Sequence, residues 1–295
     1  MNLIIGSHVS FNSKKQLLGS VEEALSYNAN TFMIYTGGAQ STIRSGINDE
    51  YTYEAFKLMI ENNINPKNVI VHAPYIVNLA NKSDERKYEF YIEFLINELN
   101  RVKELGLDKI VLHPGSATTC TKEEAISNIA EGINKIYEKT TDVMILLEYM
   151  AGKGNEVGTS IDELKSIIDK INDKDRVGVC IDTCHMNDSG VDISKFNEFL
   201  DEFDSKIGIN KIKCVHVNDS LNPIGSHKDR HANIGYGTIG FDNLINVIYN
   251  KRLDNIPKIL ETPWINRNEK DAYAPYKYEI EMIKDKKFND YINSK

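Results

Sequence analysis

Short apolar runs recur along the chain, and longer segments with apolar residues at every third or fourth position separate them. A buried parallel strand has the first pattern, and a helix with one buried face has the second. We therefore predict eight strands joined by helices. The strands are expected at about residues 3–6, 31–36, 68–73, 109–113, 143–148, 177–182, 211–217 and 258–261.

Several of the intervening segments carry specific helix signals. Residues 15–27 and 87–105 have apolar side chains at three- and four-residue spacing. Thr121 and Ser160 each stand three residues before a glutamate, which is the pattern of a capping box at a helix N-terminus. We also expect the tail, residues 269–295, to form a last helix.

The alternation of strand and helix continues without a linker or a low-complexity segment, which indicates an α/β fold with a parallel sheet. A (β/α)8 TIM barrel typically needs about 250 residues, so residues 1–295 are predicted to form a single barrel domain. An open, doubly wound sheet is the alternative architecture.

Metal-binding types of side chain stand at the downstream ends of six apolar runs. They are His72, His113, Glu148, Asp182, His216 and Glu261. Strand ends converge on one face of a closed barrel, whereas an open sheet does not bring six strands to one point. His185, Asp229 and His231 add three more ligand types nearby. Five imidazoles and four carboxylates are too many for one ion and suit a cluster of zinc-type ions.

Cysteine usage and apolar run lengths suit a cytoplasmic protein without a membrane partner. Cys180 and Cys214 lie inside apolar runs, so reduced thiols are expected, and neither Cys180 nor Cys184 is expected to bind zinc. No apolar run reaches the roughly 18 residues of a membrane span, and the N-terminus lacks the pattern of a signal peptide.

The formal charge of −8 argues at first against a nucleic-acid partner. Four of the acidic residues, however, are candidate ligands, and three divalent ions would neutralise six of the eight charges. The net charge therefore does not exclude a substrate that carries phosphate.

The motifs around the candidate ligands resemble those of bacterial endonuclease IV, also called deoxyribonuclease IV, the second family of apurinic/apyrimidinic endonucleases. The resemblance covers nearly the whole chain. It rests above all on His72-Ala73-Pro74-Tyr75, His113-Pro114-Gly115, Asp182-Thr183-Cys184-His185, His216-Val217-Asn218-Asp219 and Asp229-Arg230-His231. It implies a TIM barrel, three zinc ions per chain and a substrate of double-stranded DNA that contains abasic sites. The implied reaction hydrolyses the phosphodiester 5′ to the abasic site and leaves a 3′-hydroxyl and a 5′-deoxyribose phosphate.

The resemblance also implies which residues hold each ion. The implied sets are His72, His113 and Glu148 for the first ion, Glu148, Asp182, His216 and Glu261 for the second, and His185, Asp229 and His231 for the third. Glu148 would bridge the first two ions, and Glu261 would also orient the attacking water. Both are therefore expected to be catalytic. The third ion is expected to bind the phosphate and stabilise the leaving 3′ oxygen.

Loops at the same end of the barrel are expected to contact DNA. Tyr75, three residues after a ligand, is implied to insert at the lesion. Arg230 stands between two ligands, where a guanidinium would contact a phosphate. His8 follows the first strand and is expected to face the same opening. Gln40 is expected to press into the DNA groove from the loop after the second strand.

Two positions depart from the resemblance. Ser41 falls nearest to the position where better-studied relatives have an arginine that probes the DNA, so Arg44 becomes the candidate substitute. Leu221 stands where the family commonly has a lysine, which puts one backbone contact in doubt.

We expect the protein to act as a monomer. Two other functions are alternatives to a nuclease. A single-metal sugar isomerase or epimerase of the xylose isomerase type uses a set like Glu148, Asp182, His216 and Glu261, but it has no need of the five other ligands. A non-catalytic protein that binds lesions and contains structural zinc is the second alternative. Structural zinc sites are usually rich in cysteine, and the expected ligand set contains none.

Overall fold

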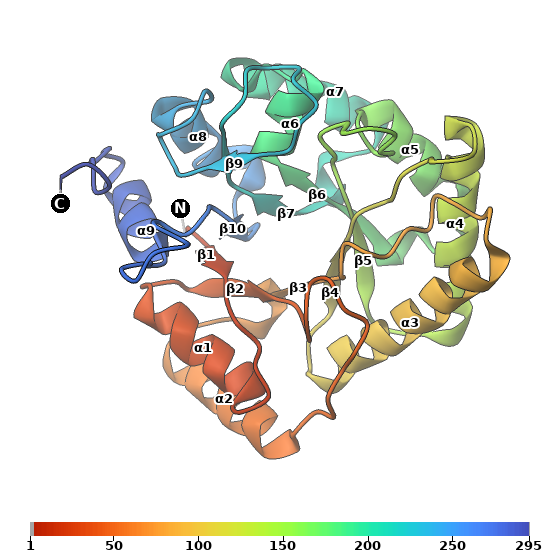
Figure 1. The fold of residues 1–295 in the computed structure, drawn as a ribbon, viewed down its shortest axis with the longest axis horizontal. Helices are drawn as coiled ribbons and strands as arrows, with labels where there is room; N and C mark the ends of the chain where they lie inside the picture. The colour runs from red at the N-terminus through yellow and green to blue at the C-terminus, as the bar shows by residue number, and fades with distance from the viewer. Residues whose placement is uncertain (1–2, 295) are drawn as a thin grey trace.

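The chain folds into a closed ring of eight parallel strands surrounded by helices, in a computed structural model that describes residues 3–294 (Figure 1). The order around the ring is β1-β10-β7-β6-β5-β4-β3-β2. The strands are β1 (Ile5–His8), β2 (Thr31–Ile34), β3 (Ile70–His72), β4 (Lys109–Leu112), β5 (Met144–Glu148), β6 (Val177–Asp182), β7 (Ile212–His216) and β10 (Lys258–Leu260). The predicted TIM barrel is confirmed, while residues 1, 2 and 295 of the predicted domain lie outside the described residues.

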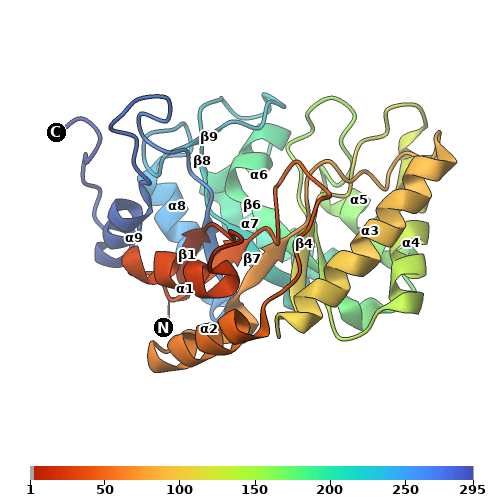
Figure 2. The same cartoon turned by 60° about the horizontal axis from the view of Figure 1, so that its bottom comes forward.

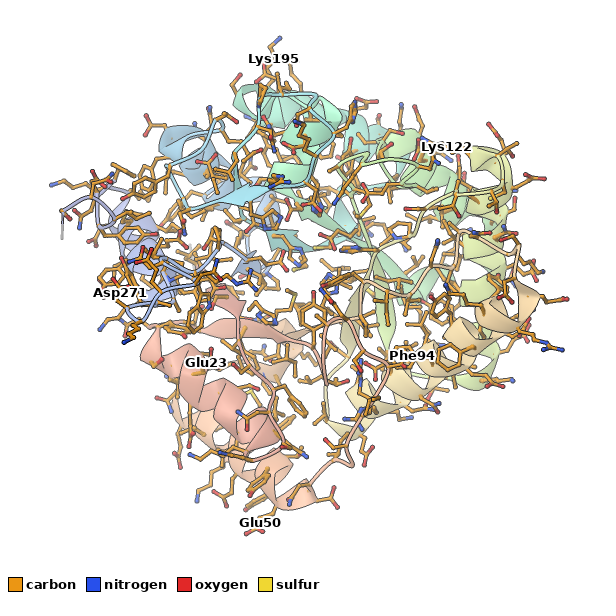
Figure 3. All side chains as sticks on the ribbon, viewed as in Figure 1. Glu23, Glu50, Phe94, Lys122, Lys195 and Asp271 are labelled. Atoms are coloured by element: carbon orange, nitrogen blue, oxygen red, sulfur yellow. The ribbon has the colours of Figure 1, made fainter. Side chains whose placement is uncertain are left out.

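Helices follow the strands and pack around the outside of the ring. They are α1 (Gln16–Ser26), α2 (Asp49–Glu61), α3 (Glu85–Glu104), α4 (Lys122–Lys139), α5 (Ile161–Lys170), α6 (Thr183–Ser189), α7 (Phe196–Lys206), α8 (Phe241–Ile248) and α9 (Tyr276–Asp285). Charged side chains such as Glu50, Lys122, Lys195 and Asp271 extend from the outer edge of the molecule (Figure 3). None of the helices in the described part of the chain combines the length and apolar composition needed to cross a membrane.

Two apolar layers hold the barrel together. The larger layer fills the space between the strands and the helices, and a smaller cluster fills the interior of the ring itself. That inner cluster consists of Met33, Ile70, Val111, Leu146, Cys180, Cys214 and Ile259, all fully buried. Apolar side chains therefore fill the interior of the ring below its open end, and the polar groups at the strand ends lie directly above them.

The predicted helix starts are borne out at most positions. The Thr121 side chain accepts from the backbone N–H of Glu124, and Glu124 reaches back to the N–H of Thr121, so the capping box is complete. Such a cap typically stabilises a helix by about 1 kcal/mol. Ser160 also caps its helix, but the Glu163 carboxylate accepts from the N–H groups of Gly158 and Thr159 instead. The second predicted capping box is therefore only half formed.

The first strand and the last helix differ from the prediction. The first strand is Ile5–His8 rather than residues 3–6, because Ser7 and His8, although polar, pair with Phe32 and Met33 of β2. The tail forms a helix only over Tyr276–Asp285. Pro275 has no N–H for a helix interior, and Lys286 ends the helix with a left-handed φ of 52°.

Long loops rise on one side of the barrel, beyond the carboxyl ends of the strands (Figure 2). One of them contains an unpredicted antiparallel hairpin, β8 (Asp219–Ser220) with β9 (His231–Ala232). The hairpin follows β7 directly and carries residues 221–230 between its two short strands. It brings a polar segment back over the open end.

Candidate metal centre

The candidate ligands converge at the open end of the barrel because most of them occupy equivalent positions in neighbouring strands. His72, Glu148, Asp182 and His216 are the last residues of β3, β5, β6 and β7. His113 and Glu261 follow the last residues of β4 and β10. His185 lies in the first turn of α6, and Asp229 and His231 come from the hairpin.

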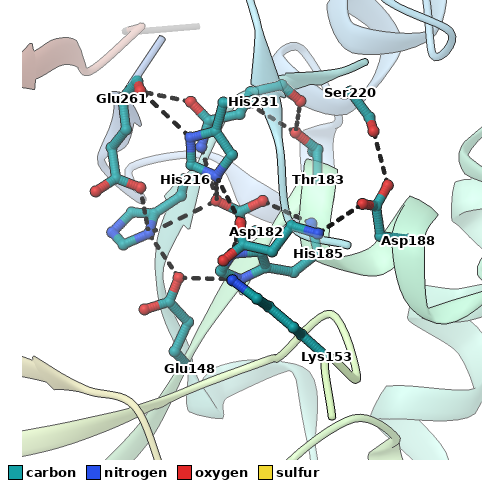
Figure 4. Close-up of polar contacts among 12 residues, drawn as sticks. Glu148, Lys153, Asp182, Thr183, His185, Asp188, His216, Ser220, His231 and Glu261 are labelled. Carbon is teal, nitrogen blue, oxygen red and sulfur yellow. Dashed lines mark hydrogen bonds and ion pairs between the residues drawn. The ribbon is translucent and has the colours of Figure 1, made fainter. Parts of the chain in front are cut away.

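Glu148 is the centre of this group. Its Oε2 lies 3.1 Å from Nε2 of His72 and 3.1 Å from Nε2 of His113. Its Oε1 lies 3.0 Å from Nδ1 of His216 and 3.3 Å from Nδ1 of His185. Figure 4 shows His216 between this carboxylate and that of Glu261, whose Oε2 is 3.1 Å from the same nitrogen. One buried carboxylate therefore joins four imidazoles.

Backbone carbonyls orient three of the imidazoles. Nδ1 of His72 lies 2.6 Å from the Ala73 oxygen, Nδ1 of His185 lies 3.0 Å from the Tyr149 oxygen, and Nδ1 of His231 lies 3.3 Å from the Glu261 oxygen. A carbonyl oxygen only accepts, so Nδ1 carries the hydrogen in each case. Nε2 is then left with its lone pair facing the centre, as in a metal-binding histidine.

The lone pairs and carboxylates face one another at the separations that a metal ion imposes. Nε2 of His72 faces Glu148 at 3.1 Å, and Nε2 of His185 faces Oδ1 of Asp229 at 3.1 Å. Two ligand atoms of a tetrahedral zinc ion with bonds of about 2.0 Å stand roughly 3.3 Å apart. Nε2 of His231 is buried without a hydrogen-bond partner. Donor types, spacing and this unpaired nitrogen all fit zinc.

The geometry reproduces two of the three implied ligand sets. Ligand atoms of the first set, and those of the second set, lie within 4.8 Å of one another. In the third set, Oδ1 of Asp229 lies 3.1 Å from Nε2 of His185 and 3.6 Å from Nε2 of His231, and two further residues join these side chains. His185 and His231 form a group with Asp182, while Asp229 groups with His231 and Cys184. The Asp182 carboxylate, 3.9 Å from Nδ1 of His216 and 3.8 Å from Nε2 of His231, thus stands between the second set and the third.

Cys184 is the one thiol near the third set. All four cysteines are free. Burial, together with the nearby Asp182 carboxylate, raises the pKa of the Cys184 thiol. Zinc binds the thiolate, so Cys184 would have to lose its proton to become a ligand, whereas the implied third set consists of carboxylate and imidazole donors.

The protonation of the centre depends on these short contacts. Burial alone would raise the pKa of Glu148, but the His216 and His113 imidazoles hold it well below its usual range. Burial alone would lower the pKa of His185, but the Asp182 and Asp229 carboxylates raise it well above its usual value. The Glu148 carboxylate is thus charged, and His185 retains its added proton unless a metal ion replaces it. Metal binding must therefore release protons.

Residues behind the ligands fix their orientation, and sequence reasoning assigned them no role. Asn218 donates to Oδ2 of Asp182 at 2.7 Å and accepts from the N–H of Glu261 at 2.9 Å. Asp188 accepts from the N–H of Asp229 at 2.9 Å, where the backbone φ is +55°. Asn218 lies in a motif that was recognised only for its histidine. Asp188, three residues after His185, carried no signal in the sequence.

Tyr75 and His8 line a cavity of about 600 Å³ that adjoins the ligand Glu261. Tyr75 is 44% exposed, so its ring extends from the loop after β3 rather than packing into the core. The His8 ring lies 5.2 Å from that of Tyr35, which lies 5.0 Å from His72. Both residues therefore stand beside the candidate metal centre.

Arg44 is held in a buried ion pair. Its Nε lies 2.7 Å from Oε1 of the fully buried Glu98 in α3, and its side chain is only 9% exposed. A Cβ on residue 37 would come within 2.6 Å of its guanidinium, so a side chain in place of Gly37 would force the guanidinium to shift. This ion pair fixes the loop after β2 and leaves no free guanidinium for DNA. Gln40, in contrast, is exposed on that loop.

Several residues in the segment between β8 and β9 remain accessible. Arg230 is exposed, and within residues 3–294 no carboxylate forms an ion pair with it. Leu221 is 61% exposed, and its N–H donates to the Arg230 oxygen. His227 is exposed in the same segment, and its Nδ1 donates to the Ala151 oxygen.

The fold and the site together define a metal-binding barrel of the xylose isomerase-like class. Residues 21–286 match the family described as xylose isomerase-like TIM barrel. A D-tagatose 3-epimerase-like protein has the same fold, with a TM-score of 0.66, 22% identity and coverage of 95% of this chain and 96% of that chain.

Within that class the chain belongs to the endonuclease IV family. A probable endonuclease 4 of Ureaplasma parvum serovar 3 is 52% identical over 295 residues, which cover 99% of this chain and 97% of the relative. The crystal structure of endonuclease IV from Thermus thermophilus superposes with a TM-score of 0.79 and 28% identity. That match covers 95% of this chain and 97% of the Thermus chain.

Proposed function

We propose that this protein cuts duplex DNA at abasic sites by hydrolysing the phosphodiester on the 5′ side, and that it uses three zinc ions to do so. The observation that carries this proposal is the arrangement around Glu148, where four imidazoles meet one carboxylate beside further carboxylates at an open barrel end. Family membership supports a nuclease. We further propose that it acts as a monomer in the cytoplasm.

The reaction adds the oxygen of water to phosphorus and breaks the bond from phosphorus to the 3′ oxygen, which leaves as a hydroxyl. Zinc ions, when bound, make water more acidic and neutralise charge on the phosphate. The Glu261 carboxylate faces both the ligands and the adjoining cavity, so it orients the attacking water. The free guanidinium of Arg230 contacts a phosphate of the strand.

A sugar isomerase or epimerase explains the site less well. It would use Glu148, Asp182, His216 and Glu261, which do form one group. It would leave the other five ligands without a role, although three of them, all imidazoles, lie within 3.3 Å of a carboxylate oxygen in the same centre. The fold match to epimerases does not distinguish the two functions, because the barrel hosts many activities.

The direct test is incision of a duplex that contains one synthetic abasic site. The purified protein should cut only the lesion-bearing strand, 5′ to the site, and prolonged chelation should abolish the cut. The products should carry a 3′-hydroxyl and a 5′-deoxyribose phosphate. An undamaged duplex of the same sequence is the control. Zinc content near one ion per chain, with no incision, would favour the isomerase.

Tyr75 is expected to fill the gap that an extruded abasic residue leaves in the duplex. A phosphate beside a stacked nucleotide cannot reach a recessed metal centre unless the backbone is bent and the sugar swung out. Tyr75→Ala should weaken binding of abasic DNA by about 1–3 kcal/mol, the scale of one stacking contact. Zinc content should not change, because Tyr75 is not a ligand. Fluorescence anisotropy and metal analysis measure the two quantities.

A fluorescent base separates insertion from simple contact. 2-Aminopurine opposite the lesion should brighten when the wild-type protein binds and brighten much less with Tyr75→Ala. Tyr53→Ala is a matched control, since Tyr53 is also exposed but lies in α2, outside the barrel. A Tyr75 variant that binds, brightens and cuts like the wild type would show that another residue fills the gap.

A further inference from the structure

The cavity beside Glu261 has one wall that the proposed function leaves unused. The loop between β10 and α9 contributes Trp264 and Arg267 to the lining of the cavity. His8 and Tyr75, which also line it, come from the N-terminal part of the chain. Trp264 is 47% exposed, and Arg267 is also exposed. Within residues 3–294 no carboxylate forms an ion pair with Arg267. A large flat ring and a free cation therefore border a space that opens onto a metal ligand.

The course of the DNA strand relates this space to the reaction. The proposed function places the phosphate 5′ to the lesion at the metal centre. The abasic deoxyribose follows directly, and the next phosphate comes after it. Glu261 belongs to both the centre and the cavity, so a strand that leaves the centre on this side enters the cavity with its sugar first.

We propose that Trp264 and Arg267 bind the segment of the strand that follows the cut, with the indole against the abasic deoxyribose and the guanidinium on the phosphate 3′ to it. This inference rests on the proposed function. The chemistry suits both partners. A ring face covers the apolar side of an extruded sugar, and a guanidinium matches the oxygens of a phosphate with two parallel hydrogen bonds.

The loop is held in shape before DNA arrives. Ile265 and Tyr273 exchange backbone hydrogen bonds of 3.0 and 3.2 Å, which close the segment that contains Arg267. The base of the loop is tied down as well, since Asn233 donates to the Pro263 oxygen at 3.0 Å. Trp264 lies between these two fixed points. Little ordering entropy is therefore lost when the two side chains bind.

Trp264 is the only tryptophan in the chain, so its fluorescence reports on this wall alone. We expect the emission of the zinc-loaded protein to change when it is mixed with a duplex containing a tetrahydrofuran abasic analogue. In stopped-flow measurements the change should precede incision. An undamaged duplex should produce a much smaller change.

Two variants test the contacts through binding. Trp264→Ala should raise the Kd for the abasic duplex by about 5- to 150-fold, the fold-change that corresponds to one aromatic stacking contact. Arg267→Gln should weaken binding and lower the slope of log Kd against log salt by about 0.9, the loss of one phosphate contact. Zinc content should stay at the wild-type value in both.

Matched controls come from the same protein. Phe90→Ala removes an aromatic ring that is 48% exposed on α3, and Lys270→Gln removes a cation from the same loop that does not line the cavity. Neither should change Kd or the salt slope. If the wild type incises abasic DNA but Trp264 emission and both variants' Kd values do not change, this inference is wrong and the proposed function stands. If the wild type neither binds nor incises abasic DNA, both fail together.

Discussion

Replacing Glu261 by Gln should lower the rate of incision by about 10³-fold or more, while the Kd for abasic DNA stays within about tenfold. The substitution keeps the size of the side chain but removes the charge that faces Nδ1 of His216 at 3.1 Å. A group that orients the attacking water acts mainly in the transition state, whereas the DNA contacts exist in both ground and transition states. Single-turnover incision and fluorescence anisotropy measure the two effects.

The interpretation depends on metal content, because Glu261 is also an expected ligand. Zinc should therefore be measured in the same samples, and the incision rate compared per zinc-loaded protein. Glu269→Gln, an exposed carboxylate on the following loop, is the control and should change neither value. If the Glu261 variant loses binding and turnover in equal proportion, the carboxylate only maintains the structure.

Removal of metal should abolish incision, but slowly. The expected ligands His72, His185 and His216 are at most 3% exposed, and each proposed ion has at least three protein ligands. Brief dilute chelator should leave most activity, whereas prolonged chelation should reduce it to background, and added zinc should restore it. The native protein should contain near three zinc ions.

Circular dichroism distinguishes loss of metal from unfolding. The apolar plug of the barrel and the layer under the helices contain none of the nine ligands, so the stripped protein should keep its helical signal. Full activity in a thoroughly stripped protein would contradict a metal-dependent reaction.

The barrel and the convergence of the candidate ligands could be predicted from the sequence because each signal is local. An apolar run followed directly by His72 or Glu148 specifies both a strand and the position of the side chain at its end. Closure of the ring then brings these side chains together without any further information. The same reasoning applies to His216, the last residue of β7.

The loops could not be predicted in this way, because their structure depends on contacts between distant residues. Arg44 was a candidate DNA contact in the sequence, but a buried carboxylate 54 positions away binds it. The hairpin was missed because each of its strands has only two residues. Trp264 gained a role only when folding placed it beside Glu261 in one cavity.

The spread of the ligands along the chain has a consequence for how the protein matures. They lie between residue 72 and residue 261, and the last of them follows the strand that closes the ring against β1. A chain still emerging from the ribosome has its early histidines exposed long before β10 has been made. It cannot yet hold the second ion, since Glu261 is absent. Assembly of the centre is therefore a late event in biosynthesis. A chain truncated before β10 would lack Glu261 and could not complete the proposed metal centre.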